Sequence, residues 1–260
     1  MMRASIRKKA TVLFVLFFGI SFVSLGSNRG SLDPNVQEML KNDSIADMAK
    51  ENFNSYAKFV YNELNELQLS YKALEQGLTG YHNLLKRDEL VRKDTLTIID
   101  FSKPSNEVRL FIIDLCENKV IHKSLCAHGL NSGRLYPKHF SNENNSKQSS
   151  LGFYVTTTTY SGKFDLALRL RGMEHSNSHA SSRGVVMHAA KYATYDFLER
   201  NGCQLGRSYG CPAVPAEGFE DVVKWIKEGS CMYIYYPSRS YKRYSKYLNR
   251  RNYLEDFVEI

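Results

Sequence analysis

Residues 183–215, with the sequence RGVVMHAAKYATYDFLERNGCQLGRSYGCPAVP, are the most informative part of the chain. The apolar, β-branched run at its start predicts a strand that ends in His188. A connecting segment then leads to Gly206-Arg207-Ser208-Tyr209-Gly210-Cys211-Pro212. The residues around Cys211 have too little apolar periodicity to belong to a core, which favours an accessible thiol at this position.

A thiol becomes an acyl-transfer nucleophile when a base takes its proton and backbone N–H groups face the oxyanion that forms on the attacked carbonyl. Cys211 is the candidate nucleophile and His188 the candidate base. Gly210 allows a sharp turn, so the amides of Tyr209, Gly210 and Cys211 are candidate oxyanion donors. Two roles stay open for Ser208: its hydroxyl orients the imidazole or the donor peptide, or it stabilises the turn.

Several ordered blocks of this sequence resemble the murein L,D-transpeptidases of the YkuD type, whose signature is a strand-borne His followed by Ser-x-Gly-Cys. The blocks are residues 99–105, 128–133, 140–142, 149–152, 168–174 and 206–215. The resemblance covers roughly residues 65 to 236 and points to a branch described as the murein L,D-transpeptidase catalytic domain family.

This resemblance implies a β-rich fold and a cysteine acyl-enzyme mechanism. Cys211 would attack the carbonyl of a diamino acid in a peptidoglycan stem peptide and release a terminal D-amino acid, with His188 as the base. An amine of a neighbouring stem would then take the acyl group, which is L,D-transpeptidation, or water would take it, which is L,D-carboxypeptidation. The resemblance implies neither a metal nor an organic cofactor.

Two positions depart from the family pattern. Ala189 follows His188 where many relatives have Gly, and Pro212-Ala213 replaces a small residue followed by Arg. The second departure removes a possible clamp for a substrate carboxylate. The acceptor, and the balance between transpeptidation and hydrolysis, therefore stay open.

Other side chains are candidates for binding substrate. A guanidinium fork fits a carboxylate bidentately, but the first alternative for each candidate arginine is an ordinary place on the surface or in a loop. These arginines are Arg169, Arg171, Arg183 and Arg207. His128 either faces the same cleft or is a polar turn residue.

Residues 93–237 form the expected catalytic domain, in which short β-branched and aromatic runs alternate with turn-rich loops. The expected strands are 95–101, 108–115, 120–127, 152–159, 166–170, 184–188 and 231–236. One helix is expected in the later part, from the stripe Phe219, Val222, Val223 and Ile226. The predicted fold class is α+β and mainly β, a YkuD-like sandwich or barrel with an N-terminal helical layer.

Residues 33–92 form that helical layer, expected to pack on the core. The spacing of Tyr56, Val60, Leu64 and Leu67 predicts one helix. Ser70 is the expected cap of a second helix, with the apolar stripe Tyr71, Leu74, Leu78, Tyr81 and Leu85.

Residues 1–26 have the pattern of a signal peptide, because four basic residues precede an apolar run. An uncleaved membrane anchor is the alternative, although the run is slightly short for a spanning helix. The sequence thus predicts an exported bacterial protein of the periplasm or cell envelope, with possible membrane association through this segment. The four basic residues of segment 1–26 account for half of the formal net charge of +8, so the charge does not imply a nucleic-acid partner.

Much of the remaining positive charge lies in residues 238–260, a basic and tyrosine-rich stretch expected to be a C-terminal tail. Such a stretch is usually solvated, and attraction to anionic wall polymer or lipid headgroups is the alternative.

Five cysteines in an exported chain raise the question of disulfides. A hairpin with its turn at Glu117-Asn118 predicts that Cys116 and Cys126 lie too far apart to bond, and a Cys203–Cys231 pair stays open.

Two rival functions remain. His175 and His179, four residues apart, raise the possibility of a zinc peptidase with His128 or His188, but their segment is polar and no H-E-x-x-H element exists. A wall-binding module that kept the fold without the activity is the second rival. The presence of both Cys211 and His188 argues against it.

Overall fold

The computed structural model describes residues 38, 43–162 and 165–258. The expected leader at residues 1–26 lies outside these ranges. Within them, no helix combines the length and the apolar character needed to cross a membrane.

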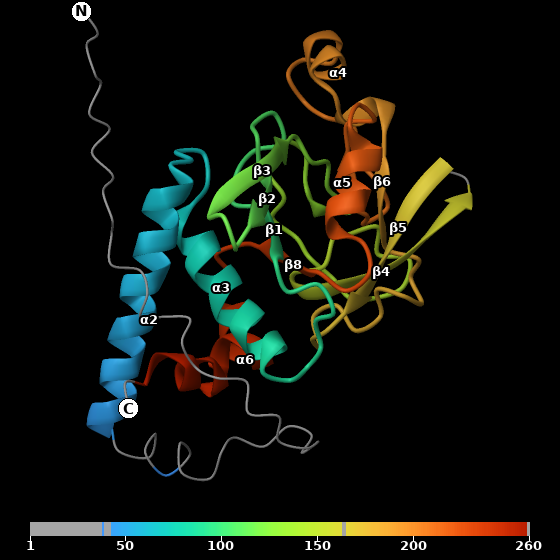
Figure 1. Cartoon of the computed structure of the whole chain (residues 1–260). Helices are drawn as coiled ribbons and strands as arrows, with labels where there is room; N and C mark the ends of the chain where they lie inside the picture. The colour runs from blue at the N-terminus through green and yellow to red at the C-terminus, as the bar shows by residue number, and fades with distance from the viewer. Residues whose placement is uncertain (1–37, 39–42, 163–164, 259–260) are drawn as a thin grey trace, which may run out of the picture. The chain divides into compact units, whose positions relative to one another are not determined.

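Two long helices form the N-terminal layer, α2 (Asp43–Leu64) and α3 (Tyr71–Leu85). Figure 1 shows them side by side, with α3 between α2 and the sheet. Ser70 caps α3 as predicted, since its hydroxyl accepts a hydrogen bond from the amide of Ala73. The expected stripe of the first helix is wrong at its end, because α2 stops at Leu64 and Leu67 is 92% exposed in the turn that follows.

Glycines in α3 let this helix approach the sheet closely. A Cβ atom at Gly80 would overlap the ring of Phe153, and one at Gly77 would lie 3.2 Å from Cδ1 of Ile98. The loss of helix propensity at these glycines is the cost of a close contact with the strands. The helical layer therefore packs on the sheet through the face of α3 that carries Gly77 and Gly80.

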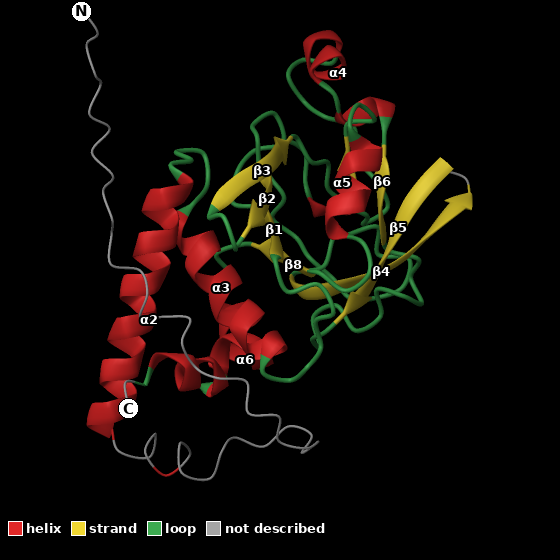
Figure 2. Ribbon diagram, in the orientation of Figure 1, coloured by secondary structure: helices red, strands yellow, loops and turns green. Residues whose placement is uncertain are grey.

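Eight strands of the described chain form a single sheet in the order β3-β2-β1-β8-β4-β5-β6-β7 (Figure 2). They are β1 (Thr95–Asp100), β2 (Leu110–Asp114), β3 (Lys119–Ser124), β4 (Gly152–Gly162), β5 (Asp165–Gly172), β6 (Val186–Ala189), β7 (Ala213–Val214) and β8 (Cys231–Tyr235). The pairs β1–β8 and β6–β7 are parallel, and the other neighbours are antiparallel.

The two edges of the sheet nearly meet. Ala127, just beyond β3, forms an antiparallel bridge with Ala213 of β7, at the opposite end of the strand order. This contact bends the sheet into a nearly closed barrel. The predicted class, mainly β with an N-terminal helical layer, is confirmed, and the barrel rather than the sandwich is the form observed.

Helices outside the N-terminal layer are more numerous than predicted. The expected helix is present as α5 (Phe219–Ile226), with all four residues of its stripe buried. The structure adds α4 (Tyr195–Arg200), α6 (Arg239–Tyr244), α7 (Lys246–Asn249) and the 3-10 segments η1 (Leu130–Ser132), η2 (Lys191–Ala193) and η3 (Asn252–Phe257). The added helices have six residues or fewer, too short to show a clear apolar period.

The C-terminal stretch packs against the domain, which corrects the expectation of a solvated tail. Tyr241 and Tyr247 are buried, and both belong to the main core. Glu174, itself buried, accepts hydrogen bonds from the hydroxyls of Tyr241 and Ser245 and from the amide of Phe153. This carboxylate therefore ties α6 to the sheet.

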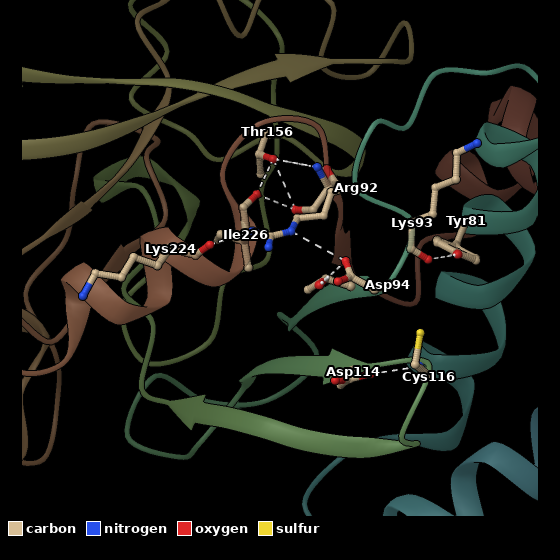
Figure 3. Close-up of polar contacts among 11 residues, drawn as sticks. Tyr81, Arg92, Lys93, Asp94, Asp114, Cys116, Thr156, Lys224 and Ile226 are labelled. Atoms are coloured by element: carbon tan, nitrogen blue, oxygen red, sulfur yellow. Dashed lines mark hydrogen bonds and ion pairs between the residues drawn. The ribbon is translucent and has the colours of Figure 1, made fainter.

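The segment between α3 and β1 is fastened to distant parts of the fold (Figure 3). The guanidinium of Arg92 donates to the carbonyl of Lys224 at 2.6 Å and lies 3.6 Å from the carboxylate of Asp94. The hydroxyl of Tyr81 donates to the carbonyl of Lys93 at 2.5 Å. These bonds hold the junction between the helical layer and the sheet.

The β2–β3 hairpin is shorter than the strands expected at residues 108–115 and 120–127. Asp114 lies opposite Lys119, and Cys116 belongs to the turn rather than the ladder. A bulge between Ile112 and Ile113 shifts the pairing, and no residue pattern predicts it. The thiols of all five cysteines are free in the structure. The Cys203–Cys231 disulfide that the sequence left open is therefore not formed.

Candidate active site

Strands β6 and β7 bring the predicted base and the predicted nucleophile to adjacent backbones. His188 lies opposite Ala213 in parallel register, and its amide donates to the carbonyl of Pro212 at 3.4 Å. Two residues earlier on β6, the amide of Val186 donates to Sγ of Cys211 at 3.5 Å. The residues on either side of Cys211 are thereby held against the strand that carries His188.

The imidazole of His188 has a defined tautomer. Its side chain is buried, and Nδ1 lies 2.8 Å from the carbonyl oxygen of Ala189. A carbonyl oxygen only accepts, so Nδ1 carries the hydrogen and Nε2 carries the lone pair that can take a proton. Burial lowers the pKa of His188, and the bond to Ala189 opposes that shift in part. The ring is therefore neutral at neutral pH, as a general base must be.

The thiol of Cys211 is partly exposed. Burial of the sulfur raises its pKa, while the amide of Val186 and the charge of Arg183 act in the opposite direction. Sγ also lies 3.7 Å from the carbonyl of Gly184. At neutral pH the resting pair is therefore a thiol and a neutral imidazole, and deprotonation has to accompany attack on a carbonyl.

Ser208 fixes the turn that presents Cys211. Its hydroxyl donates to the carbonyl of Cys211 at 2.6 Å and accepts from the amide of Gly210 at 3.0 Å. Of the two roles left open for Ser208, these bonds are those of a turn-stabilising hydroxyl. They also engage the Gly210 amide, which leaves Tyr209 and Cys211 as the candidate oxyanion donors of this loop.

Gly210 is required by both conformation and space. Its φ of +127° lies in a region that residues with side chains rarely adopt. A Cβ atom there would lie 2.7 Å from the carbonyl oxygen of Gln148 and 3.2 Å from a nitrogen of Arg183. The predicted sharp turn is thus present, and it is packed against the segment around residue 148.

Two neighbouring segments form hydrogen bonds with the Cys211 loop. The amide of Ser208 donates to the carbonyl of His128 at 3.0 Å, and the amide of Leu130 donates to the carbonyl of Ser208 at 2.7 Å. The hydroxyl of Ser149 donates to the carbonyl of Gly210 at 3.2 Å. The loop is therefore held in place before any substrate binds.

His128 lies in the interior and does not line an open cleft. Its side chain is buried, with Nδ1 2.8 Å from Nη2 of Arg109 and Nε2 3.3 Å from the carbonyl of Gly133. Burial, together with the charge of Arg109, lowers the pKa of His128 to about 3. A neutral ring that accepts from Arg109 and donates to Gly133 satisfies both contacts.

The buried Arg109 was missed by sequence reasoning. Its guanidinium is fully buried, donates to the carbonyls of Cys126 and Lys103, and lies 4.8 Å from the ring centre of Phe101. The available signal was one charged residue in the apolar run 108–113. Through His128, whose carbonyl receives the Ser208 amide, this arginine supports the Cys211 loop.

Two of the four candidate arginines serve the loops that surround Cys211. Arg183 donates to the carbonyls of Ser141 and Gln148 at 2.8 and 2.6 Å, and so fixes the segment between them. Arg207 donates to the carbonyls of Leu130 and Gly133 at 3.2 and 3.3 Å. Their hydrogen bonds are structural, and the charge of Arg183 also acts to lower the pKa of the Cys211 thiol.

The two arginines of β5 differ in their surroundings. Arg169 lies opposite Val186, so it shares a sheet face with Val186 and, two residues along β6, with His188. Its exposed guanidinium lies 4.4 Å from the ring centre of Tyr160. Arg171 instead forms a 3.1 Å ion pair with Glu89, beyond α3. Arg171, two residues along β5, lies on the same sheet face, so the two arginines differ in their distance from His188 along the strand and in the Glu89 ion pair.

The histidines of the zinc alternative are dispersed in different environments. Nδ1 of His179 lies 3.1 Å from the carbonyl of Asn142, whereas His128 is held by Arg109. In the ranges that the structure describes, no group of three or more His, Cys, Asp or Glu residues could hold a metal ion.

The model of one known protein family matches most of the chain. The family model described as L,D-transpeptidase catalytic domain matches residues 65–235. No curated protein matches the chain.

Similar solved structures include three mycobacterial enzymes. An L,D-transpeptidase from Mycobacterium smegmatis shares 12% identity, with 55% of this chain and 59% of that chain covered and a TM-score of 0.35. One from Mycobacterium tuberculosis shares 15% identity, with 55% and 58% covered and a TM-score of 0.36. L,D-transpeptidase 3 from Mycobacterium tuberculosis, in complex with a faropenem-derived adduct, shares 14% identity, with 55% and 60% covered and a TM-score of 0.36.

This chain covers less than two thirds of the length of each of these three structures. The family match is more extensive. It runs from the turn before α3 to the end of β8 and includes both His188 and Cys211. The chain belongs to the L,D-transpeptidase catalytic domain family.

Proposed function

We propose that this protein is a peptidoglycan L,D-transpeptidase that works through an acyl-enzyme on Cys211. The observation that carries the proposal is the pairing of β6 with the residues around Cys211, which sets the thiol beside the strand of a neutral, oriented His188. Family membership supplies the reaction class.

In the first half-reaction, Sγ of Cys211 attacks the carbonyl carbon of the diamino acid in a stem peptide, and Nε2 of His188 takes the thiol proton. The oxyanion accepts hydrogen bonds from the amides of Tyr209 and Cys211, since Ser208 occupies the Gly210 amide. The bond to the terminal D-amino acid then breaks, and the leaving amine takes the proton from His188. A thioester on Cys211 remains.

In the second half-reaction, an amine of a neighbouring stem attacks the thioester while His188 removes a proton from that amine. Collapse of the intermediate forms the new amide and returns the proton to the thiolate of Cys211. Water in place of the amine gives a trimmed peptide, which is the carboxypeptidase alternative. Both outcomes use the same residues, so the acceptor that reaches the thioester decides between them.

Substrate carboxylates have a candidate partner in Arg169. It is exposed, and it lies on the sheet face that carries His188. A stem peptide carries several carboxylates, and a guanidinium binds such a group in a planar, bidentate manner. We assign to Arg169 the carboxylate contact that the family pattern places after the nucleophile, where this chain has Pro212-Ala213.

We place this reaction outside the cytoplasmic membrane, because residues 1–26 have the composition of an export signal or anchor. Cell fractionation tests this placement. Full-length protein in the soluble cytoplasm would contradict it.

The reaction is tested by incubating the full chain with disaccharide tetrapeptides and weighing the products. Release of the terminal D-amino acid together with crosslinked dimers supports transpeptidation, whereas tripeptide alone supports hydrolysis. Activity that survives strong chelation removes the zinc-peptidase alternative. Unchanged substrate after long incubation with folded protein would contradict both forms of the proposal.

A further inference from the structure

A cavity separate from the Cys211 site lies beside the Cys211 loop. It has a volume of about 660 Å³, within the range of small-molecule sites, and lies between residues 138–148, residues 174–176 and the start of α6. Cys211, His188 and Ser208 are not among its lining residues. The mechanism proposed above therefore gives this cavity no role.

Aromatic rings and small polar groups line the cavity together. Phe140 and Tyr236 have ring centres 4.8 Å apart, and Tyr244 also lines the cavity with 75% of its surface exposed. Hydroxyl groups of Ser238 and Ser240 lie among the rings, whereas the Asn142 amide and the Ser176 hydroxyl already donate to neighbouring residues. Aromatic faces pack against the C–H faces of pyranose rings, while hydroxyls and amides bond sugar hydroxyl and acetamido groups.

The charges of the cavity favour a ligand with little net charge. Lys138 and Glu143 are exposed and of opposite sign, and the carboxylate of Glu174 is already used by Tyr241 and Ser245. Arg183 donates to the backbone of the cavity wall at Ser141 and Gln148, and Arg243 lies 5.6 Å from the ring centre of Tyr244. The free charges among the lining residues, Lys138 and Glu143, balance, which fits a glycan.

One chain segment separates the cavity from the loop of Cys211. Gln148 lines the cavity, and its carbonyl accepts from Arg183 and lies against Gly210. Neighbouring backbones are about 5 Å apart, whereas three extended residues span about 10 Å. The three residues that join the glycan to the attacked carbonyl of a stem peptide are long enough to cross this segment.

We propose that the cavity between residues 138–148 and α6 binds the N-acetylglucosamine–N-acetylmuramic acid disaccharide of the glycan strand whose stem peptide reaches Cys211. This inference rests on the proposed function for its substrate. It assigns to helix α6 a part in recognising the wall polymer.

The test is a titration of the full chain with the peptide-free disaccharide, its lactyl carboxyl group capped as an amide as in the strand, monitored by calorimetry or saturation-transfer NMR. We expect saturable binding that Tyr244→Ala weakens about three- to tenfold, through loss of one stacking ring. Ser240→Trp, which fills the cavity, should abolish binding. Tyr195→Ala, which removes an exposed tyrosine on α4 that does not line the cavity, should bind as the wild type does, and so should Cys211→Ala.

Absence of saturable binding would overturn the proposal, as would equal affinity in wild type, Tyr244→Ala and Ser240→Trp. Tyr244 and Ser240 are both exposed, and circular dichroism checks that each variant is folded. Turnover of a tetrapeptide without sugar, measured in parallel, separates the two ideas. Disaccharide binding without any turnover would keep the cavity assignment and refute the proposed reaction, whereas turnover without disaccharide binding would do the reverse.

Discussion

The hydroxyl of Ser208 donates to the carbonyl oxygen of Cys211 at 2.6 Å. The same oxygen atom of Ser208 accepts the amide of Gly210, so one side chain closes the turn on both sides of the glycine. The position of the candidate nucleophile is therefore set by the turn itself. This relationship, together with the β6–β7 pairing, leads to the predictions that follow.

Ser208→Ala should lower both stability and turnover. Loss of the hydroxyl leaves the buried Gly210 amide without its acceptor, at a cost of about 1–3 kcal/mol in the free energy of unfolding. The released loop should reduce kcat by at least about tenfold, because a small misplacement of a nucleophile is costly. Ser182→Ala, at an exposed hydroxyl, is the matched control and should change neither quantity. Normal kcat in Ser208→Ala would show that the turn does not depend on this hydroxyl.

Gly210→Ala should be poorly tolerated, since the new Cβ meets the carbonyl of Gln148 at 2.7 Å in a backbone with positive φ. We expect a loss of at least about 2 kcal/mol in stability and of most activity. Gly202→Ala provides the comparison, because Gly202 also has a positive φ but has open space around it. That variant should cost about 1 kcal/mol and keep its activity. Equal effects in the two variants, by chemical denaturation and kcat, would contradict the role given to the Gln148 contact.

Arg169→Gln and Arg171→Gln form a matched pair on one strand. Both lie on the sheet face of His188, but Arg169 is nearer to His188 in the register, and Arg171 is paired with Glu89. We expect kcat/KM for a tetrapeptide donor to fall about five- to fiftyfold in Arg169→Gln, as one carboxylate contact is lost. Arg171→Gln should remain within about twofold of wild type. A larger loss in Arg171→Gln than in Arg169→Gln would refute the assignment.

His128 should make the fold sensitive to acid. Its pKa is lowered from 6.5 to about 3, so the unfolded chain takes up a proton below pH 6.5 that the folded chain does not bind. The stability from this group is complete at pH 7 and falls as the pH drops below 6.5, by about 2 kcal/mol at pH 5. His128→Asn, which can still accept from Arg109, should show a shallower decline in urea denaturation between pH 7 and pH 5. An unchanged slope would contradict the buried, neutral state of the ring.

Much of the fold could be predicted because its signals are local. Ser70 precedes an apolar stripe at helical spacing, and the runs that became β1, β2 and β8 are rich in residues that favour strands. The β7 strand was missed because Ala213–Val214 is only two residues long. Leu67 continued the helical period by coincidence, since periodicity alone does not show where a chain leaves a helix.

The candidate site was predictable in its reactive groups but not in its supports. Cys211 and His188 stand out by chemistry and by their place in a motif. The contact between Arg109 and His128 joins residues 19 positions apart, and the bond from Ser149 to Gly210 spans 61. Such pairs depend on how the barrel closes, which no local pattern in the sequence encodes.

The central claim is that the acyl group is carried by Cys211, and the mass of the intact protein during turnover tests it most directly. The full chain, quenched in acid after mixing with a disaccharide tetrapeptide, should gain the mass of the donor minus its terminal D-amino acid. Peptide mapping should place that mass on Cys211.

Cys203→Ala, which removes an exposed thiol outside the turn, should acylate and turn over like the wild type. Cys211→Ala should gain no mass and form no product, although it folds. Turnover by Cys211→Ala, or an acyl group on any other residue of the wild type, would contradict the account.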